Sequence, residues 1–393
     1  MKWHSTLSQE ADLEKAMAES FQQIHTQLSE DPDLVVIFVS EHHAKKFDQA
    51  PVWLAKQFPK SLLIGCSAGG VIGGGKEIEG RPGFSLTAAT LPNVELIPFR
   101  TESKHLPKSV TAPQEWEKAL HTPEKKNPHF LLLADPFTFE AEYFLQGLDQ
   151  TFPKAKKIGG LASGGRGPGA NVLYLGDKIY PEGLVGMAMC GDIEIDTIVA
   201  QGCRPIGMPM FVTRFQKNVI TELDGRPPAE VLQALFQSLG PSDQQLFRTS
   251  LFLGVVMKES QQEYHQGDFL IRNLVGMDPN TGALAVGTLL KDGMVVQFHL
   301  RDAKTSAQDL EELLSKYKNQ LTAQPQGSLL FSCLGRGVHL YGKPDHDTNV
   351  FRQKLGDIPL GGFFCNGEIG PVQETTFLHG YTSSFGIFRP KKG

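Results

Sequence analysis

The sequence predicts an α/β protein in which duplicated α/β units, with mixed β-sheets flanked by helices, are arranged as two packed domains. Short apolar runs such as LVVIFVS (34–40) and HFLLLAD (129–135) are typical of buried strands, and amphipathic segments lie beside them. Glycine-rich turns follow further on, at CSAGGVIGGG (66–75) and GGLASGG (159–165). This order, found twice, indicates a repeated α/β unit rather than a helical bundle.

The first copy is preceded by an amphipathic helix over residues 9–29. Its apolar residues recur at steps of three and four, so they share one face that we expect to pack on a sheet. These residues are Leu13, Met17, Phe21, Ile24 and Leu28. Asp31-Pro32 ends the helix. The elements expected next are a strand, a helix, a strand and an antiparallel pair of strands, at 34–40, 44–57, 61–65, 84–91 and 94–99.

An internal duplication relates residues 30–100 to residues 128–200. KKIGGLASGG matches LLIGCSAGG, Pro153-Lys154 matches Pro59-Lys60, and LVGMAMCGDIEIDTIVA matches FSLTAATLPNVELIPF. The period is too long for a solenoid, so the duplication predicts two similar α/β units that pack side by side.

A weaker third copy is expected at the C-terminus. SLLFSC (328–333) is typical of a strand, VFRQKLG of a short helix, and IPLGGFFCNGE takes the place of the second strand and its glycine loop. A different segment, about 226–326, separates it from the second copy and begins with a helix that has Pro227 and Pro228 in its first turn. The change of pattern predicts an N-terminal domain at 1–225 and a C-terminal domain at 226–393.

Composition limits the class of partner. The chain of 393 residues has a formal net charge of −5, with 40% hydrophobic and 21% charged residues. It therefore lacks the overall basic field that nucleic acid or an anionic membrane would attract. The apolar runs are too short to span a bilayer, and the N-terminus does not resemble a signal peptide. We therefore expect a cytoplasmic protein with no nucleic-acid or membrane partner.

The cysteines favour neither a disulfide framework nor a metal site. There are 5 of them, an odd number, and none forms a C-x-x-C pair. His346-Asp347 also lacks a companion histidine or cysteine at ligand spacing. We expect no metal and no cofactor.

The C-terminal run IPLGGFFCNGEIGPVQETTFLHGY places polar residues among apolar ones. Cys365 and His379 allow a nucleophile and a base, with Asn366 or Glu368 orienting the imidazole, although Cys365 also fits a buried core or the lining of a pocket. A buried carboxylate needs a partner. For Glu368 the candidates are Arg336, His379 and the ammonium group of a ligand.

Loops at strand ends supply the other candidate ligand-binding residues, because α/β sheets bind ligands beyond the carboxyl ends of their strands. Asp135 ends one predicted strand, Arg301 ends another, and Arg166 lies in the glycine-rich SGGRGPG. This glycine loop does not fit G-x-x-x-x-G-K-[ST], so a tight turn is favoured over a nucleotide phosphate loop.

Three long runs resemble a known family: IVAQGCRPIGMPMFVT, FLIRNLVGMDPNTGALAVG, and GGFFCNGEIGPV followed by FLHGYTSSFGIFRP. They resemble the FIST domains, sensory domains shared by F-box proteins and intracellular signal-transduction proteins. The resemblance implies an N-terminal FIST domain to about 225 and a C-terminal FIST domain after it. It also implies binding of small ligands, amino acids among them, and a signalling protein as partner. No kinase, cyclase, methyl-accepting or F-box segment is recognisable in the sequence, so we expect no output domain.

Three functions are consistent with these observations. The favoured one is a cytoplasmic small-molecule-binding sensory protein, with no catalytic residues. The second is a thiol-dependent hydrolase or transferase that uses Cys365 and His379. The third is a protein-interaction adaptor without a small-molecule site.

Overall fold

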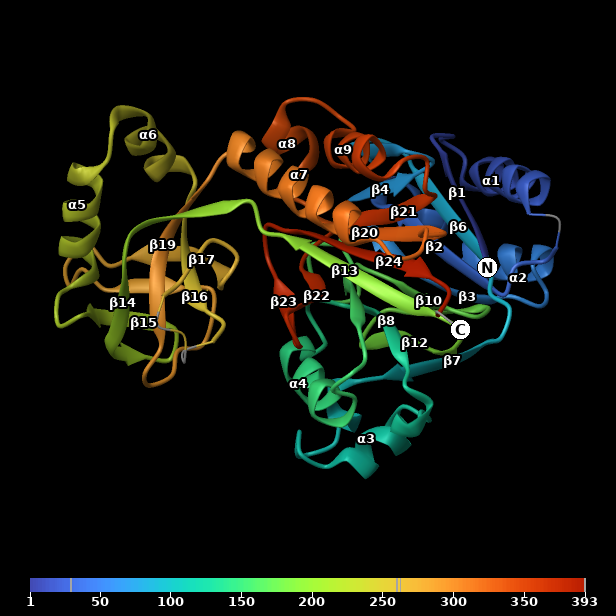
Figure 1. The fold of residues 1–393 in the computed structure, drawn as a ribbon, viewed down its shortest axis with the longest axis horizontal. Coiled ribbons are helices and arrows are strands. Elements are labelled where there is room, and N and C mark those ends of the chain that lie inside the picture. Colours follow the sequence, from blue (N-terminus) through green and yellow to red (C-terminus); the bar gives the residue numbers. More distant parts are fainter. Residues whose placement is uncertain (29, 259–260, 262, 392–393) are drawn as a thin grey trace. The chain divides into compact units, whose positions relative to one another are not determined.

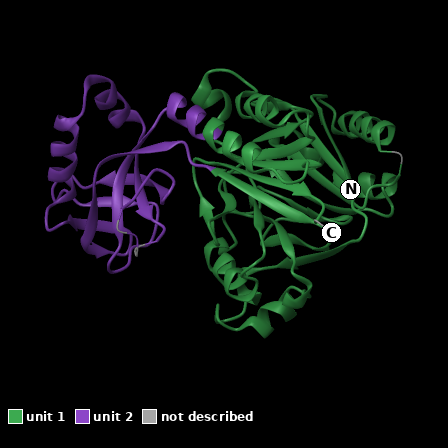
Figure 2. Ribbon diagram, viewed as in Figure 1, with its two compact units in different colours: residues 1–199, 311–393 green, residues 200–310 purple. Residues whose placement is uncertain are grey.

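The computed structural model describes residues 1–28, 30–258, 261 and 263–391 (Figure 1). The chain divides into two compact units (Figure 2). Unit 1 comprises residues 1–199 and 311–393, and unit 2 comprises residues 200–310. These units differ from the expected sequential halves, because the C-terminal third copy belongs with the first two. The α/β class itself is confirmed.

The secondary structure follows the predicted order over most of the chain. The helices are α1 (Leu13–Gln27), η1 (Glu41–Lys46), α2 (Gln49–Gln57), η2 (Ser103–His105), α3 (Pro113–Ala119), η3 (Glu124–Lys126), α4 (Ala141–Thr151), α5 (Pro228–Ser238), α6 (Pro241–Thr249), α7 (Ala303–Gln320), α8 (Gly337–Tyr341) and α9 (His346–Leu355). The strands of unit 1 are β1 (Lys2–Ser8), β2 (Leu34–Ser40), β3 (Leu62–Ala68), β4 (Gly70–Gly73), β5 (Lys76–Glu79), β6 (Phe84–Thr90), β7 (Val94–Thr101), β8 (His129–Ala134), β9 (Lys157–Leu161), β10 (Leu173–Leu175), β11 (Lys178–Tyr180), β12 (Leu184–Gly191), β13 (Glu194–Ala200), β20 (Gly327–Cys333), β21 (Leu360–Cys365), β22 (Glu368–Val372), β23 (Thr375–His379) and β24 (Ser383–Arg389). The strands of unit 2 are β14 (Cys203–Gln216), β15 (Val219–Leu223), β16 (Leu251–Val256), β17 (Phe269–Met277), β18 (Leu284–Val286) and β19 (Val295–Arg301).

Within the described residues, unit 1 contains three six-stranded sheets with the same plan. Each has a parallel pair at its centre, β2–β3, β8–β9 or β20–β21, and an antiparallel strand beside it, β6, β12 or β24. The hairpin on the other side comes from a different copy. β10–β11 extends the first sheet, β22–β23 the second, and β4–β5 the third. The hairpin of each copy therefore pairs with the sheet of another copy.

The outer strands are also exchanged between copies, in the opposite cyclic direction. β7 of the first copy pairs with β12, and β13 of the second copy lies beside β24. The corresponding place in the first sheet is taken by β1, which pairs antiparallel with β6 from Lys2↔Thr90 to Ser8↔Phe84. The N-terminal strand thus completes the third copy. The sequence analysis did not assign this strand, because the rest of its copy lies more than three hundred residues away in the chain.

The strand registers confirm that the three copies are equivalent. In each parallel pair a glycine of the second strand lies opposite an aliphatic residue of the first: Ile37↔Gly65, Leu132↔Gly159 and Leu330↔Gly362. A Cβ atom on these glycines would lie 2.1, 1.8 and 1.9 Å, respectively, from the carbonyl oxygen of that partner. Only glycine fits so close an approach of two backbones.

One apolar core lies between the three sheets. Val36 and Phe38 of β2 pack in it together with Leu131, Leu329 and Phe363 of the other copies. In β2 and β8 the alternate residues point the other way, toward the helices that cover the first and second sheets. Burial on both faces explains why LVVIFVS and HFLLLA are continuous apolar runs rather than alternating ones.

Unit 2 is built around a closed barrel with the strand order β14-β15-β18-β17-β16-β19. The sequence analysis did not assign β14, whose run RPIGMP carries two prolines and a glycine. The structure accommodates them with an irregularity in the pairing of β14 with β19 between Ile206 and Met210, where Gly207 has a φ of +64°. The helix with Pro227 at its start is confirmed as α5, which begins at Pro228.

We predict that Gly362→Ala destabilises the protein by about 3 kcal/mol, the upper end of the cost of overpacking a core. The added methyl group would lie 1.9 Å from the Leu330 carbonyl oxygen, and the φ of +147° is itself unfavourable for alanine. Urea unfolding monitored by circular dichroism measures the loss. Gly80→Ala is the matched control, because its φ is +66° and a Cβ there meets no atom within 4 Å. Its expected cost is about 1–2 kcal/mol. Equal losses for the two variants would contradict the proposed steric role of Gly362.

Candidate functional site

The loops after the three central strand pairs meet one another. The Gly69 N–H donates to Ser163 Oγ at 2.8 Å, and the Ser163 hydroxyl donates to the Phe364 carbonyl. The Asn366 N–H donates to the Leu161 carbonyl at 3.1 Å. The three loops therefore come together at the carboxyl ends of the strands and are joined there by hydrogen bonds.

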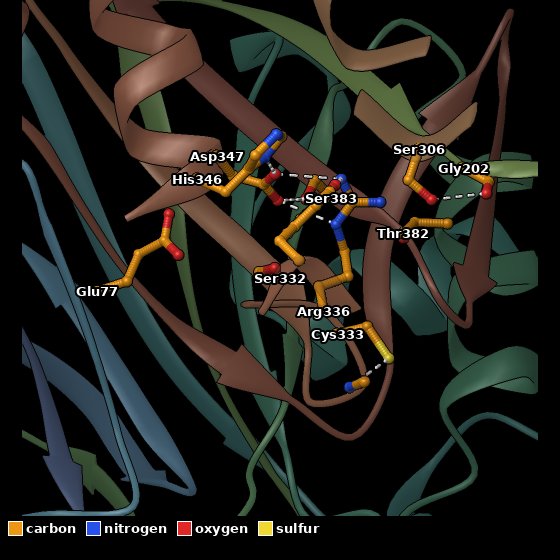
Figure 3. Close-up of polar contacts among 12 residues, drawn as sticks. Glu77, Gly202, Ser306, Ser332, Cys333, Arg336, His346, Asp347, Thr382 and Ser383 are labelled. Carbon is orange, nitrogen blue, oxygen red and sulfur yellow. Dashed lines mark hydrogen bonds and ion pairs between the residues drawn. The ribbon is translucent and has the colours of Figure 1, made fainter. Parts of the chain in front are cut away.

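The most concentrated charges in this region are Arg336, which follows β20, and Asp347, in the first turn of α9 (Figure 3). Arg336 Nε lies 2.9 Å from Asp347 Oδ2, and Nη2 lies 3.2 Å from Oδ1. The side chains are 0% and 2% exposed. Nη2 also donates to Tyr341 Oη at 2.6 Å. This fork-like pairing lets a full positive charge remain inside the protein.

Two more groups hold the Asp347 carboxylate. His346 Nδ1 lies 2.9 Å from Oδ1, and the Ser383 hydroxyl donates to Oδ2 at 2.5 Å. The ring of His346 stacks on Tyr341, with centroids 3.5 Å apart. Burial alone would raise the pKa of Asp347, but the Arg336 charge and these hydrogen bonds hold that pKa below its ordinary value. Asp347 therefore remains ionised.

Glu77 and Glu79 bring the hairpin of the first copy to this cluster. The Thr348 N–H donates to Glu77 Oε1, and the Val338 N–H donates to Glu79 Oε1, both at 2.8 Å. Glu77 is 3% exposed. Burial, and next the charge of Asp347, raise the pKa of Glu77 to about 8. At neutral pH Glu77 therefore keeps its proton, and these hydrogen bonds join the first and third copies.

Glu368 belongs to the same C-terminal copy as Arg336 and Asp347, but its hydrogen-bond partner is a different residue. It is 0% exposed, and its Oε2 accepts hydrogen bonds from the Thr382 N–H at 3.1 Å and the Thr382 hydroxyl at 2.8 Å. Sequence reasoning did not name Thr382. Arg336, one of the partners considered, is ion-paired with Asp347 instead. His379, another candidate, lies opposite Glu368 in the β22–β23 register.

Cys365 and His379 are both buried, on β21 and β23. The Cys365 thiol donates to the Ser332 carbonyl at 3.4 Å, and His379 Nε2 lies 3.0 Å from the Gly370 carbonyl oxygen. Burial raises the pKa of the Cys365 thiol well above its ordinary value. Because the thiolate is the reactive form, this surrounding disfavours a nucleophilic cysteine.

The remaining predicted residues lie in separate places. Asp135 is buried, accepts from the Thr138 hydroxyl at 2.8 Å and from Asn171 Nδ2 at 3.1 Å, and so ties its loop together. Arg166 and Asn366 are exposed. Arg301 belongs to unit 2, where its guanidinium lies 5.7 Å from the centre of the Phe252 ring.

Unit 2 also contains a cavity of about 710 Å³ between α6, the start of β14 and the first turns of α7. It is lined by Arg204, Ser242, Asp243, Gln245, Leu246, Thr249, Asp302, Ala303, Lys304, Thr305 and Gln308. The Arg204 guanidinium is shared by two carboxylates, with Nη2 2.6 Å from Asp243 Oδ1 and Nε 3.3 Å from Asp302 Oδ2. Asp302 also caps α7 by accepting from the Thr305 N–H at 2.8 Å.

None of the ligand-binding residues predicted from the sequence lines this cavity. Arg204, Asp243 and Asp302 come from three separate segments, and no spacing in the chain relates them. Their one local signal is the arginine directly after Cys203 at the start of β14, which is too common to identify a site.

No group of three or more histidine, cysteine, aspartate or glutamate side chains is placed to hold a metal ion in the part of the chain that the structure describes. None of the helices in that same part combines the length and the hydropathy that crossing a bilayer requires.

Comparison with known proteins identifies two family domains. Residues 33–226 match the FIST N domain, and residues 228–371 match the FIST C domain. The division between these matches falls next to the sequence boundary expected near 225, although the compact units of the structure do not follow it.

Full-length relatives include uncharacterized mycobacterial proteins. One from Mycobacterium tuberculosis is 37% identical over 384 residues, covering 96% of this chain and 97% of the relative. One from Mycobacterium bovis is 33% identical over 381 residues, with 96% of both chains covered. An F-box/LRR-repeat protein of Arabidopsis thaliana is 28% identical over 133 residues, 30% of this chain and 25% of the plant protein.

Among solved structures, a cyanuric acid hydrolase from A. caulinodans aligns over 100% of both chains at 8% identity, with a TM-score of 0.34. A likeness this weak carries no argument about fold or chemistry.

We predict that the stability of the native protein falls as pH rises from about 4.5 toward 8, in part because of Glu77. Its pKa is raised in the folded state, so the unfolded chain releases this proton first and folding is penalised as pH increases. The expected slope from this group is about 1.4 kcal/mol per pH unit. Urea unfolding at pH 5.5, 6.5 and 7.5 measures it. Glu77→Gln should remove that part of the decline, and identical slopes in both proteins would show that Glu77 is ionised when folded.

We also predict that iodoacetamide at pH 7.5 leaves Cys365 unmodified in the native protein and modifies it in urea. The buried thiol holds its proton, and the reagent requires a thiolate. The half-buried Cys333 should react first and serves as the internal control. Peptide mass spectrometry locates the label. Selective labelling of native Cys365 within minutes would instead support the thiol-dependent enzyme.

Proposed function

Because the chain belongs to the FIST family and carries both its N and C domains, we propose that it is a cytoplasmic sensory protein that binds an amino acid or a related metabolite. FIST domains form a sensory, ligand-binding family. In this proposal the ligand is small and polar, and a separate signalling protein receives the response.

The observation that carries the proposal is the cavity of about 710 Å³ in unit 2, whose lining combines charges of both signs with hydroxyl and amide groups. Ligand pockets of proteins fall in the same range of volume, roughly 300–1,000 Å³. A lining with a few convergent polar groups is what orients a small molecule in such pockets.

The buried clusters of unit 1 favour a structural role over a ligand site. The carboxylates of Asp135, Asp347 and Glu368 already accept hydrogen bonds from protein donors. A ligand would have to replace those donors and would regain little, because net hydrogen-bond energies in proteins are about 1 kcal/mol. A ligand can bind in the cavity of unit 2 without replacing protein donors in this way.

We predict that at least one of the twenty L-amino acids raises the thermal unfolding midpoint of the full chain. A ligand that binds only the native state, at a concentration 100 times its Kd, adds about 2.7 kcal/mol. Differential scanning fluorimetry with each amino acid measures the shift, and mass spectrometry under native conditions detects any metabolite retained during purification. A protein that retains no small molecule and responds to no amino acid would refute the proposed function.

A further inference from the structure

The charged groups around the cavity of unit 2 differ in how many protein partners they already have. Arg204 directs Nη1 and Nη2 at Asp243, at 3.2 and 2.6 Å, and Nε at Asp302, at 3.3 Å. All three guanidinium nitrogens therefore already have hydrogen-bond partners in the cavity wall. Asp302 is committed as well, since it accepts from Arg204 and also from both the N–H and the hydroxyl of Thr305.

Asp243 keeps capacity for another donor. A carboxylate offers about four acceptor positions, and the Arg204 contacts occupy one on each oxygen. The Asp243 side chain is 32% exposed, so it is accessible from the cavity. It can therefore accept from an ammonium group without releasing Arg204.

Lys304 supplies the matching cation. It lies in the first turn of α7 and is exposed at the cavity. Considering the described side chains alone, no carboxylate forms an ion pair with it. A lysine ammonium is a flexible point charge with three donors, which suits a ligand carboxylate.

The charge balance selects the kind of ligand. Arg204 and Lys304 carry the positive charges of the lining, and Asp243 and Asp302 carry the negative ones. A net cation or anion would leave one charge in this lining without compensation, whereas a zwitterion pairs with one charge of each sign. Leu246 offers an apolar surface for the rest of the molecule.

We propose that this cavity is the ligand site of the chain and that its ligand is a zwitterion, with its carboxylate on Lys304 and its ammonium on Asp243. This inference rests on the proposed function and adds the place of binding and the class of ligand. A free amino acid has this chemistry, and the volume of about 710 Å³ accommodates it.

Calorimetric titration of the full chain tests the assignment. The probes are the twenty L-amino acids and, for each one that binds, its methyl ester and its N-acetyl derivative, which lack the carboxylate and the ammonium charge, respectively. We expect each derivative to bind at least tenfold more weakly than the parent. We expect Lys304→Gln to weaken binding of the parent at least tenfold, and its affinity for the methyl ester to match that of the wild type.

Lys318→Gln is the matched control, because Lys318 is exposed on the same helix but does not line the cavity. It should bind like the wild type. Asp243→Asn is the complementary variant, expected to weaken the parent while leaving affinity for the N-acetyl derivative unchanged. Its thermal midpoint is measured in parallel, because Asp243 also contacts Arg204.

The outcomes separate the two levels of the inference. An amino acid that binds with the same affinity to wild type, Lys304→Gln and Asp243→Asn overturns the site and leaves the sensory function standing. A binder whose ester and N-acetyl derivative bind equally well overturns the zwitterion. Failure of every probe to bind overturns this proposal, and a different metabolite retained in native mass spectrometry would then still support the sensory function.

Discussion

The exchange of hairpins among the three copies is the constraint on which the rest of unit 1 depends. A sheet edge presents unpaired N–H and C=O groups that must be covered or paired. Here β3, β9 and β21 are each covered by a hairpin from another copy, and β6, β12 and β24 each by an outer strand from another part of the chain. No single copy contains all strands of its own sheet, so the copies must fold together.

This exchange also explains the composition of the compact units. The hairpin β4–β5 of the first copy finds its partner only in β21, near the end of the chain. The C-terminal strands therefore return to unit 1 after the chain has formed the barrel, and residues 200–310 become an insertion between the second and third copies. The family matches divide the chain into two consecutive segments, whereas the compact units are determined by which strands pair.

Buried polar contacts mark the places where an exchanged hairpin meets a helix of the receiving copy. Glu77 of β5 accepts from the backbone at the start of α9. At the corresponding junction, Asp149 of α4 accepts from Thr376 of β23 at 2.7 Å and pairs with the buried Lys157 at 2.7 Å. Removing one partner of such a pair leaves a buried charge uncompensated. These contacts thus specify which hairpin docks where, and they account for polar residues in otherwise apolar runs. The cavity of unit 2, by contrast, has charges that face open space and remain accessible to a ligand.

Elements whose causes are local could be predicted from the sequence. Continuous apolar runs identified β2, β8 and β20, two prolines placed the start of α5, and repeated glycine motifs revealed the copies, because periodicity and backbone sterics act over a few residues. It also showed that Glu368 required a partner, but it could not name Thr382. The completion of the third copy by β1, and the sharing of the Arg204 guanidinium by Asp243 and Asp302, became apparent only from the folded chain. Pairing between distant segments depends on how whole sheets and helices meet, and the spacing of residues along the chain does not record that.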